Sequence, residues 1–139
     1  MKLKRQQQGL AMVEFAIVGL LLLTIMFGIC EMGILLYDQA IITNASREAA
    51  RSGIVLRKSL LTDPQIQAVA TNYCLNNLVT FHTGVTPTIT VTHLAADALG
   101  LPLRINVTYN YTYLVLSTLT AGVIPSTKLL SATSTMYYE

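Results

Sequence analysis

Residues 9–37 have the sequence GLAMVEFAIVGLLLLTIMFGICEMGILLY, an apolar run that is interrupted only by Glu14, Thr24 and Glu31. As an α-helix, the part between the two glutamates extends about 24 Å, slightly less than the ~30 Å hydrocarbon core of a bilayer. The apolar residues on either side bring the run to spanning length and place Glu14 and Glu31 at or inside the membrane boundaries. The stretch therefore predicts a transmembrane helix.

Three basic residues, Lys2, Lys4 and Arg5, precede the apolar run. A basic segment before an apolar one is also typical of a cleaved secretory signal. This run, however, is longer than the about 7–15 apolar residues of such signals, and no small-x-small cleavage site follows it. An uncleaved signal anchor stays open as an alternative. The positive-inside rule places the amino end in the cytoplasm and exports the rest of the chain.

The composition agrees with a small membrane-anchored protein. Of the 139 residues, 53% are hydrophobic and 12% are charged, and this charged share is about half the roughly 25% of a soluble domain. Such a bias excludes an ordinary cytosolic enzyme and a disordered tail. The net charge is +2 without a basic stripe, so a nucleic-acid binder is not expected. The two cysteines cannot form a disulfide framework.

The helix is expected to continue beyond the membrane to about Ser52, with Gly53 as its stop signal. Apolar residues at i, i+4 spacing indicate an amphipathic extension that packs on a small domain. The apolar stripe consists of Tyr37, Ile41, Ala45 and Ala49, and the other faces carry Asp38, Gln39, Thr43, Asn44, Arg47 and Arg51.

The remaining chain predicts a small domain with one helix and about three antiparallel strands. Residues 62–79 have a helical pattern that Thr62 or Asp63 caps. From Gly84 onward the apolar period is two, which indicates strands. The expected strands cover 88–92, 105–115 and 130–138, with turns at Asp97–Pro102 and around Gly122 and Pro125. The fold class is therefore α+β, with a long N-terminal helix ahead of the small domain.

The spacing of Gly9 and Glu14 suggests chemistry at the start of the apolar run. A charged side chain at the centre of a membrane helix costs about 2.5–3.5 kcal/mol on insertion scales, and less near the boundary. Glu14 therefore needs a cationic partner. Cleavage after Gly9 would create one, because it leaves an α-amino group on Leu10 about one helical turn away. The alternative is that Glu14 simply reaches the headgroups at the membrane edge, and both interpretations stay open on residue physics alone.

The segment Gly9-Leu10-Ala11-Met12-Val13-Glu14-Phe15 resembles the class III signal of type IV prepilins, which prepilin peptidase cleaves after the glycine. Together with 14–18, 27–33 and 44–51, it makes the chain similar, in order and spacing, to the TadE-like family, the minor pseudopilins of the tight-adherence (Flp) pilus machinery. The resemblance covers residues 9 to about 53. One departure is visible, since Gly19-Leu20 stands where the family often has an early proline.

The resemblance implies a leader (1–9), a pilin-like transmembrane spine with its amphipathic extension (10–53) and an exported domain (54–139). It makes Gly9 and Leu10 the processing site and Glu14 the residue that sets subunit register. It also implies helix contacts by Phe15, Glu31, Gly33, Asn44, Arg47, Glu48 and Arg51. The expected partners are prepilin peptidase, other pilins or pseudopilins, the pilus assembly platform and the lipid bilayer of the cytoplasmic (inner) membrane. Loss of the three basic leader residues lowers the net charge from +2 to −1 (2 minus 3).

For the other candidate residues, a purely structural interpretation stands beside the functional one. Glu31 marks the outer membrane boundary or makes a helix contact. Arg47 and Arg51 dock a partner or belong to a solvated face, on which Glu48 and Arg51 have the i, i+3 spacing of an ion pair. Core packing is the default for Cys30, Cys74 and the tyrosine ladder Tyr109, Tyr111 and Tyr113, with a partner surface as the ladder's alternative.

No cofactor, metal site or enzymatic activity is expected. His82 and His93 lie far apart in the sequence without further ligands at metal-binding spacing. The chain lacks a phosphate-binding glycine loop and a Gly-x-Ser-x-Gly motif. A minor pseudopilin is therefore favoured, and the main alternative is an uncleaved, membrane-anchored protein whose exported domain binds a ligand or scaffolds a complex.

Overall fold

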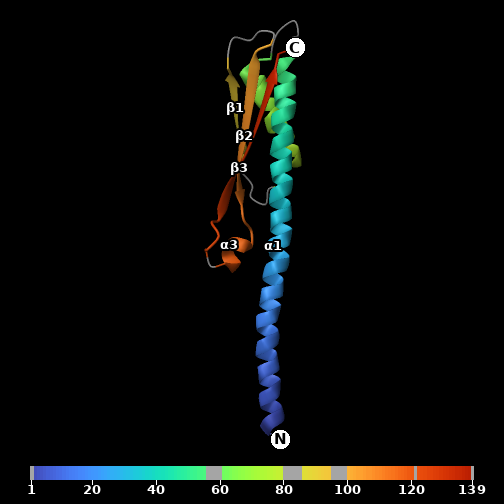
Figure 1. Ribbon diagram of the computed structural model, residues 1–139, viewed down its shortest axis with the longest axis vertical. Helices are drawn as coiled ribbons and strands as arrows, with labels where there is room; N and C mark the ends of the chain where they lie inside the picture. Colours follow the sequence, from blue (N-terminus) through green and yellow to red (C-terminus); the bar gives the residue numbers. More distant parts are fainter. Residues whose placement is uncertain (1, 56–60, 80–85, 95–99, 121, 139) are drawn as a thin grey trace. The chain divides into compact units, whose positions relative to one another are not determined.

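The computed structural model describes residues 2–55, 61–79, 86–94, 100–120 and 122–138, without the side chains of residues 2–8. It confirms the α+β class, because a long apolar N-terminal helix is followed by a second helix and three antiparallel strands (Figure 1). The elements are α1 (Lys2–Ile54), α2 (Asp63–Asn77), β1 (Thr88–His93), β2 (Pro102–Thr112), α3 (Leu116–Leu119) and β3 (Thr127–Tyr137). His82, Gly84 and the first half of the turn expected at Asp97–Pro102 lie outside the described residues.

The chain forms two compact units. The apolar-helix unit comprises Met1–Gly33 and Tyr113–Ser126, and the sheet unit comprises Ile34–Thr112 and Thr127–Glu139. Helix α1 therefore contributes residues to both units. The segment 113–126, which connects β2 to β3 and contains α3, is called the arm below.

The sheet has the strand order β1-β2-β3, with both neighbouring pairs antiparallel (Figure 1). Its central strand β2 pairs with β1 through Ile89↔Val107 and with β3 through Val107↔Ala132. Every second residue of β2 is buried, as the sequence alternation predicts for a strand with one face on the core. These buried residues are Leu103, Ile105, Val107, Tyr109 and Tyr111.

Within the sheet unit, α1 packs on the sheet through small residues that allow a close approach. Gln39 Nε2 donates to the carbonyl of Ser131 at 3.0 Å, and the hydroxyls of Ser46 and Ser134 are 2.7 Å apart. A Cβ atom on Gly53 would lie 2.6 Å from Leu103 Cδ2. The fully buried residues of this part of α1 include Ile42, Ala45, Ser46, Ala49 and Ala50.

Helix α2 completes the core with an i, i+4 stripe of Ile66, Ala70 and Cys74, all fully buried. Thr62 caps this helix as predicted, since its backbone N–H and its hydroxyl both donate to Gln65 Oε1, at 3.0 and 3.2 Å. The burial of Cys74 confirms the predicted core packing of this residue. At its other end the helix stops at Asn77, two residues before the predicted end.

Two details of the expected pattern are wrong. Tyr37, expected on the buried stripe, is 47% exposed, whereas Asp38, expected outside it, is fully buried. The reason is a hydrogen bond in which the Val79 backbone N–H donates to Asp38 Oδ1 at 3.0 Å. The central strand also ends at Thr112 and not at Val115, because its partner β3 begins opposite it at Thr127.

Candidate functional site

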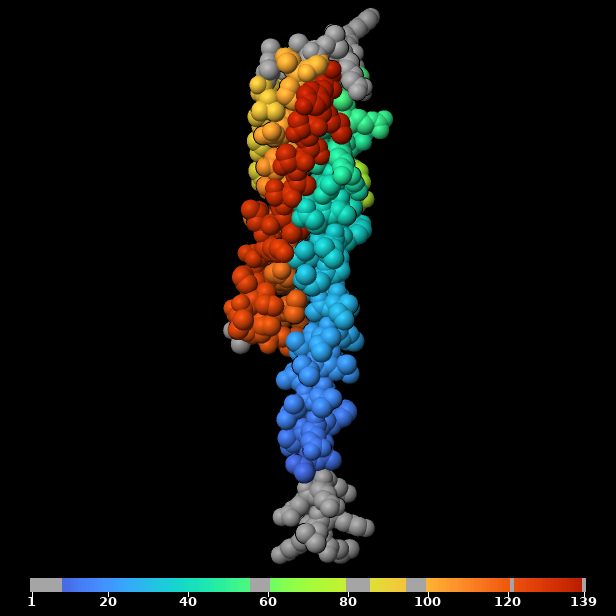
Figure 2. Space-filling view, viewed as in Figure 1, coloured from blue at the N-terminus to red at the C-terminus, as the bar shows by residue number. Residues whose placement is uncertain are grey.

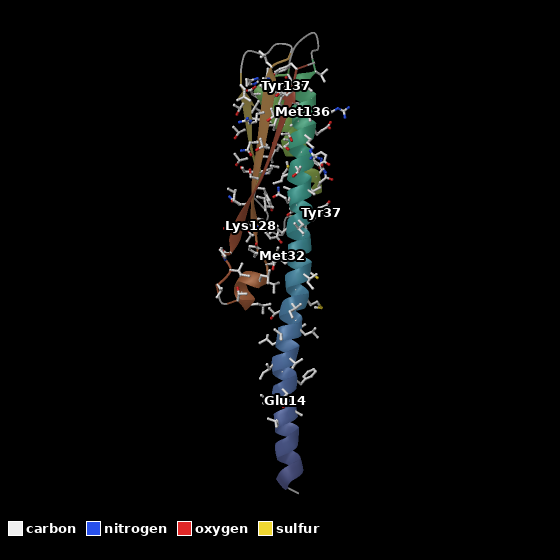
Figure 3. The ribbon with its side chains drawn as sticks, in the orientation of Figure 1. Glu14, Met32, Tyr37, Lys128, Met136 and Tyr137 are labelled. Carbon is white, nitrogen blue, oxygen red and sulfur yellow. The ribbon has the colours of Figure 1, made fainter. Side chains whose placement is uncertain are left out.

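The N-terminal half of α1 presents its side chains on the surface from Gly9 onward (Figure 2). Leu10 is 63% exposed and Phe15 79% exposed. Glu14, which lies between them and is labelled in Figure 3, is also exposed. The backbone is helical through Gly9 and Leu10. Among the residues that the structure describes, none forms an ion pair with Glu14.

The exposed surface of this stretch is apolar around the whole helix. One helix is long and apolar enough to cross a membrane, and none of its most apolar window is buried within the chain. A helix that is apolar all round requires a nonpolar environment on every side, either lipid or neighbouring helices. The exposed residues include Met12, Val13, Ile17, Val18, Leu20, Leu21, Leu22, Leu23, Ile25, Met26 and Ile29.

Glu31 is only 4% exposed, although it lies inside this apolar run. Its carboxylate accepts hydrogen bonds from the backbone N–H groups of the arm at Leu114 and at Leu116, the latter at 2.9 Å, and more weakly from Val115 at 3.4 Å. Charge-assisted bonds of this kind are the strong ones in proteins. Of the two roles left open for Glu31, the structure provides a contact, and that contact is made with the arm.

The arm and its short helix α3 were not predicted, because the loop was expected only from Gly122 and Pro125. The arm closes on itself through a hydrogen bond from the Tyr113 backbone N–H to the Ser126 carbonyl, at 2.9 Å. The available signal was compositional, since 105–127 contains no charged residue. A charge-free stretch of this length is unusual for a surface connection, which is normally polar.

The other residues implied by the family resemblance lie on the outer face of α1 and not in the core. Gly33, Asn44, Arg47, Glu48 and Arg51 are all exposed. No ion pair joins Glu48 and Arg51, both of which lie in the described part of the chain. These side chains are therefore available for contacts outside the protomer. Cys30 is likewise exposed and not packed in a core.

Asp38 is the most unusual polar residue of the sheet unit. Its Oδ1 is bonded to the backbone of Val79, whereas Oδ2 is buried without a hydrogen-bond partner among the described residues. Burial raises the pKa of this carboxyl above 3.8, and the bond from Val79 opposes the rise only in part. The pKa of Tyr109 is also raised, first by burial and then by the charge of Asp38.

His93 contacts side chains of α2 and of the end of the chain. Its Nε2 lies 2.7 Å from Asp63 Oδ1, and its Nδ1 lies 3.3 Å from the hydroxyl of Tyr138. Within the described ranges, no three His, Cys, Asp or Glu side chains come together as a metal site requires. This cluster links α2, β1 and the end of the chain.

Comparison with known families identifies the N-terminal segment. The family model described as TadE-like protein matches residues 9–51. Over this segment the chain is similar to the TadE-like family. The TadE-like family is a pilus-related structural family and not an enzyme family. The match begins at Gly9 and ends before α2 and the sheet, so it contains every site residue implied by the resemblance. No curated protein and no solved structure matches the chain significantly.

Proposed function

We propose that this protein is a TadE-like minor pseudopilin that prepilin peptidase cleaves after Gly9 and that acts in the assembly or regulation of Flp pili. The observation that carries the proposal is the family match over 9–51, which coincides with an apolar helix whose surface is exposed. A soluble protein would bury such a helix. Here the helix needs lipid before assembly and neighbouring subunits after it.

Cleavage would supply a partner for Glu14, which forms no ion pair with any of the described side chains. Removal of 1–9 leaves an α-amino group on Leu10, and residues four apart lie on the same face of a helix. The Glu14 carboxylate of one subunit then pairs with the new amine of its own or a neighbouring chain. Because an unpaired charge is costly in this environment, the pairing fixes the axial register of the helices.

Cleavage also changes how the chain is held in the membrane. Lys2, Lys4 and Arg5 anchor the amino end on the cytoplasmic side by the positive-inside rule. Without them the net charge falls from +2 to −1 (2 minus 3). The mature chain is then easier to extract toward a filament. Gly33, Asn44, Arg47, Glu48 and Arg51, exposed on α1, would contact neighbouring pilins or the assembly platform.

The deciding experiment is the intact mass and amino-terminal sequence of the membrane-extracted protein, from cells with and without prepilin peptidase. We expect the chain to begin at Leu10 only when the peptidase is present. A start at Met1 in both samples would leave a permanently anchored protein whose exported domain binds or scaffolds, and the pseudopilin proposal would be wrong.

The register role is tested by Glu14→Gln, which keeps the size of the side chain but removes its charge. We expect membrane insertion and cleavage to persist while pilus formation is lost, measured as surface-exposed pilin. Val13→Ala, one residue away and also at an exposed position, is the matched control and should leave piliation intact. Normal piliation with Glu14→Gln would contradict the register role.

A further inference from the structure

The composition of the arm is unusual for a segment that is exposed to water. No Asp, Glu, Lys or Arg occurs between Arg104 and Lys128. Several large apolar side chains of the arm are nevertheless on the surface, with Leu114 42%, Leu119 40% and Val123 84% exposed. An exposed apolar group in a charge-free segment indicates an interaction site, because isolated surface loops are normally polar.

The contacts of the arm fix its position along α1 within the apolar-helix unit. Glu31 accepts the backbone hydrogen bonds of Leu114 and Leu116. A Cβ atom on Gly28 would lie 3.6 Å from Leu116 Cδ2. Both contacts come from one turn of α1, and Figure 1 shows α3 beside this helix. Residues 114–116 of the arm are therefore held at the level of residues 28–31.

That level corresponds to the outer part of a bilayer. At about 1.5 Å per residue, residues 28–31 lie roughly 27–32 Å along the helix from Leu10, compared with a hydrocarbon core of ~30 Å. If the core begins at Glu14, the same residues lie deeper, inside the outer leaflet. In either placement the exposed apolar side chains of the arm meet acyl chains or the boundary just above them.

The hydrogen bonds of Glu31 are consistent with a position in the outer part of the bilayer. A carboxylate and a set of backbone N–H groups are both costly in hydrocarbon when they are unpaired. Here the carboxylate takes three consecutive backbone N–H groups of the arm as its donors, so each satisfies the other away from water. The arm can thus enter a nonpolar layer without leaving these groups unpaired.

We propose that the arm, residues 113–126, dips into the outer leaflet and gives the protein a second, non-spanning membrane contact whose partner is lipid. Lipid is favoured over another subunit because the arm lies in one compact unit with the apolar, unburied helix and contacts it at residues 28–31, near the outer end of the proposed span. The proposal rests on the membrane span of the proposed function. It also means that extraction from the bilayer must withdraw the arm as well as the helix.

The chain contains no tryptophan, so a single introduced tryptophan reports its own surroundings. We would reconstitute full-length Val123→Trp in vesicles of phosphatidylcholine and phosphatidylglycerol, with and without phospholipids brominated on their acyl chains. We expect blue-shifted emission and a loss of intensity with the brominated lipids. Leu119→Trp, at the middle residue of the exposed group Leu114, Leu119 and Val123, is a second reporter. The native residue at position 123 is mostly exposed, so its replacement removes little packing.

Two matched variants separate the arm from the span. Leu22→Trp lies in the middle of the apolar helix and should be quenched strongly. Thr133→Trp, at an exposed position of β3, should keep water-like emission and resist quenching. If both arm reporters are unquenched while Leu22→Trp is quenched, the arm proposal is overturned and the span stands. This includes blue-shifted emission without quenching, which would indicate a neighbouring subunit. If Leu22→Trp itself is unquenched, the span and the proposed function fail.

Discussion

At the scale of single residues, Asp38 makes stability depend on pH. Its raised pKa means that the folded chain holds this proton more tightly than the unfolded chain does. As the pH rises above 3.8, the unfolded state loses the proton first, so the free energy of unfolding falls until the folded carboxyl also ionises. Asp38→Asn has no proton to lose, and we expect it to flatten this decline.

The measurement is the free energy of unfolding of the full chain in detergent micelles as a function of pH, for the wild type and Asp38→Asn. The difference between the two curves isolates Asp38, because the other carboxyl groups are common to both proteins. Glu48→Gln, at an exposed position, is the control and should leave the slope unchanged. Parallel curves for the wild type and Asp38→Asn would contradict a raised pKa of this carboxyl in the folded state.

The burial of Asp38 is a feature that the sequence pattern does not predict. An i, i+4 stripe places apolar Tyr37 inside and charged Asp38 outside, and both placements are wrong. The partner of Asp38 is the backbone of Val79, 41 residues away. Residue type alone does not encode such a bond, since any residue but proline supplies the N–H. Glu31 is similar, because its donors lie 83 to 85 residues further along the chain.

At the scale of the elements, Gly53 permits the close packing of α1 on β2 and α2. A Cβ atom there would lie 2.6 Å from Leu103 Cδ2 and 2.9 Å from Ile66 Cδ1. Both side chains are fully buried and have little room to move. We expect Gly53→Ala to lower the free energy of unfolding by about 1–2 kcal/mol, as overpacking does.

Gly33→Ala is the matched control, because it makes the same change in the same helix where nothing lies within 4 Å of the new atom. Alanine is the better helix former by up to about 1 kcal/mol, so this variant should be neutral or more stable. Chemical denaturation of both proteins in micelles, followed by near-ultraviolet circular dichroism of the tyrosines, provides the comparison. Equal stability of the two variants would show that the contact at Gly53 is not restrictive.

The elements themselves were largely predictable, because their signals are local. The alternation in β2 and the Thr62 cap of α2 each need only neighbouring residues. The end of β2 was not predictable. Tyr113 and Val115 continue the alternation, but β3 begins opposite Thr112, so no paired strand remains beyond it. The arm that replaces the strand end is defined by contacts with Glu31, which no local pattern reveals.

At the scale of the whole molecule, the proposed orientation puts the leader in the cytoplasm and the sheet unit on the other side of the membrane. The reason is charge, since Lys2, Lys4 and Arg5 precede the apolar run. Labelling of introduced cysteines measures this orientation, provided that neither of the two native thiols reacts. Cys30 is exposed and must be replaced by serine. Cys74 can stay, because it is fully buried and burial raises the pKa of its thiol to about 11, which keeps it protonated and unreactive.

In the Cys30→Ser background we would compare Thr133→Cys with Gln7→Cys, using a maleimide that does not cross membranes. Cells without prepilin peptidase are required, so that residue 7 stays on the chain. In intact spheroplasts we expect Thr133→Cys to be labelled and Gln7→Cys to be labelled only after permeabilisation. The unmodified background protein should stay unlabelled in both conditions. Labelling of Gln7→Cys from outside would show that the proposed orientation is reversed. The new amine on Leu10 would then arise on the side of the membrane away from a cytoplasmic peptidase site.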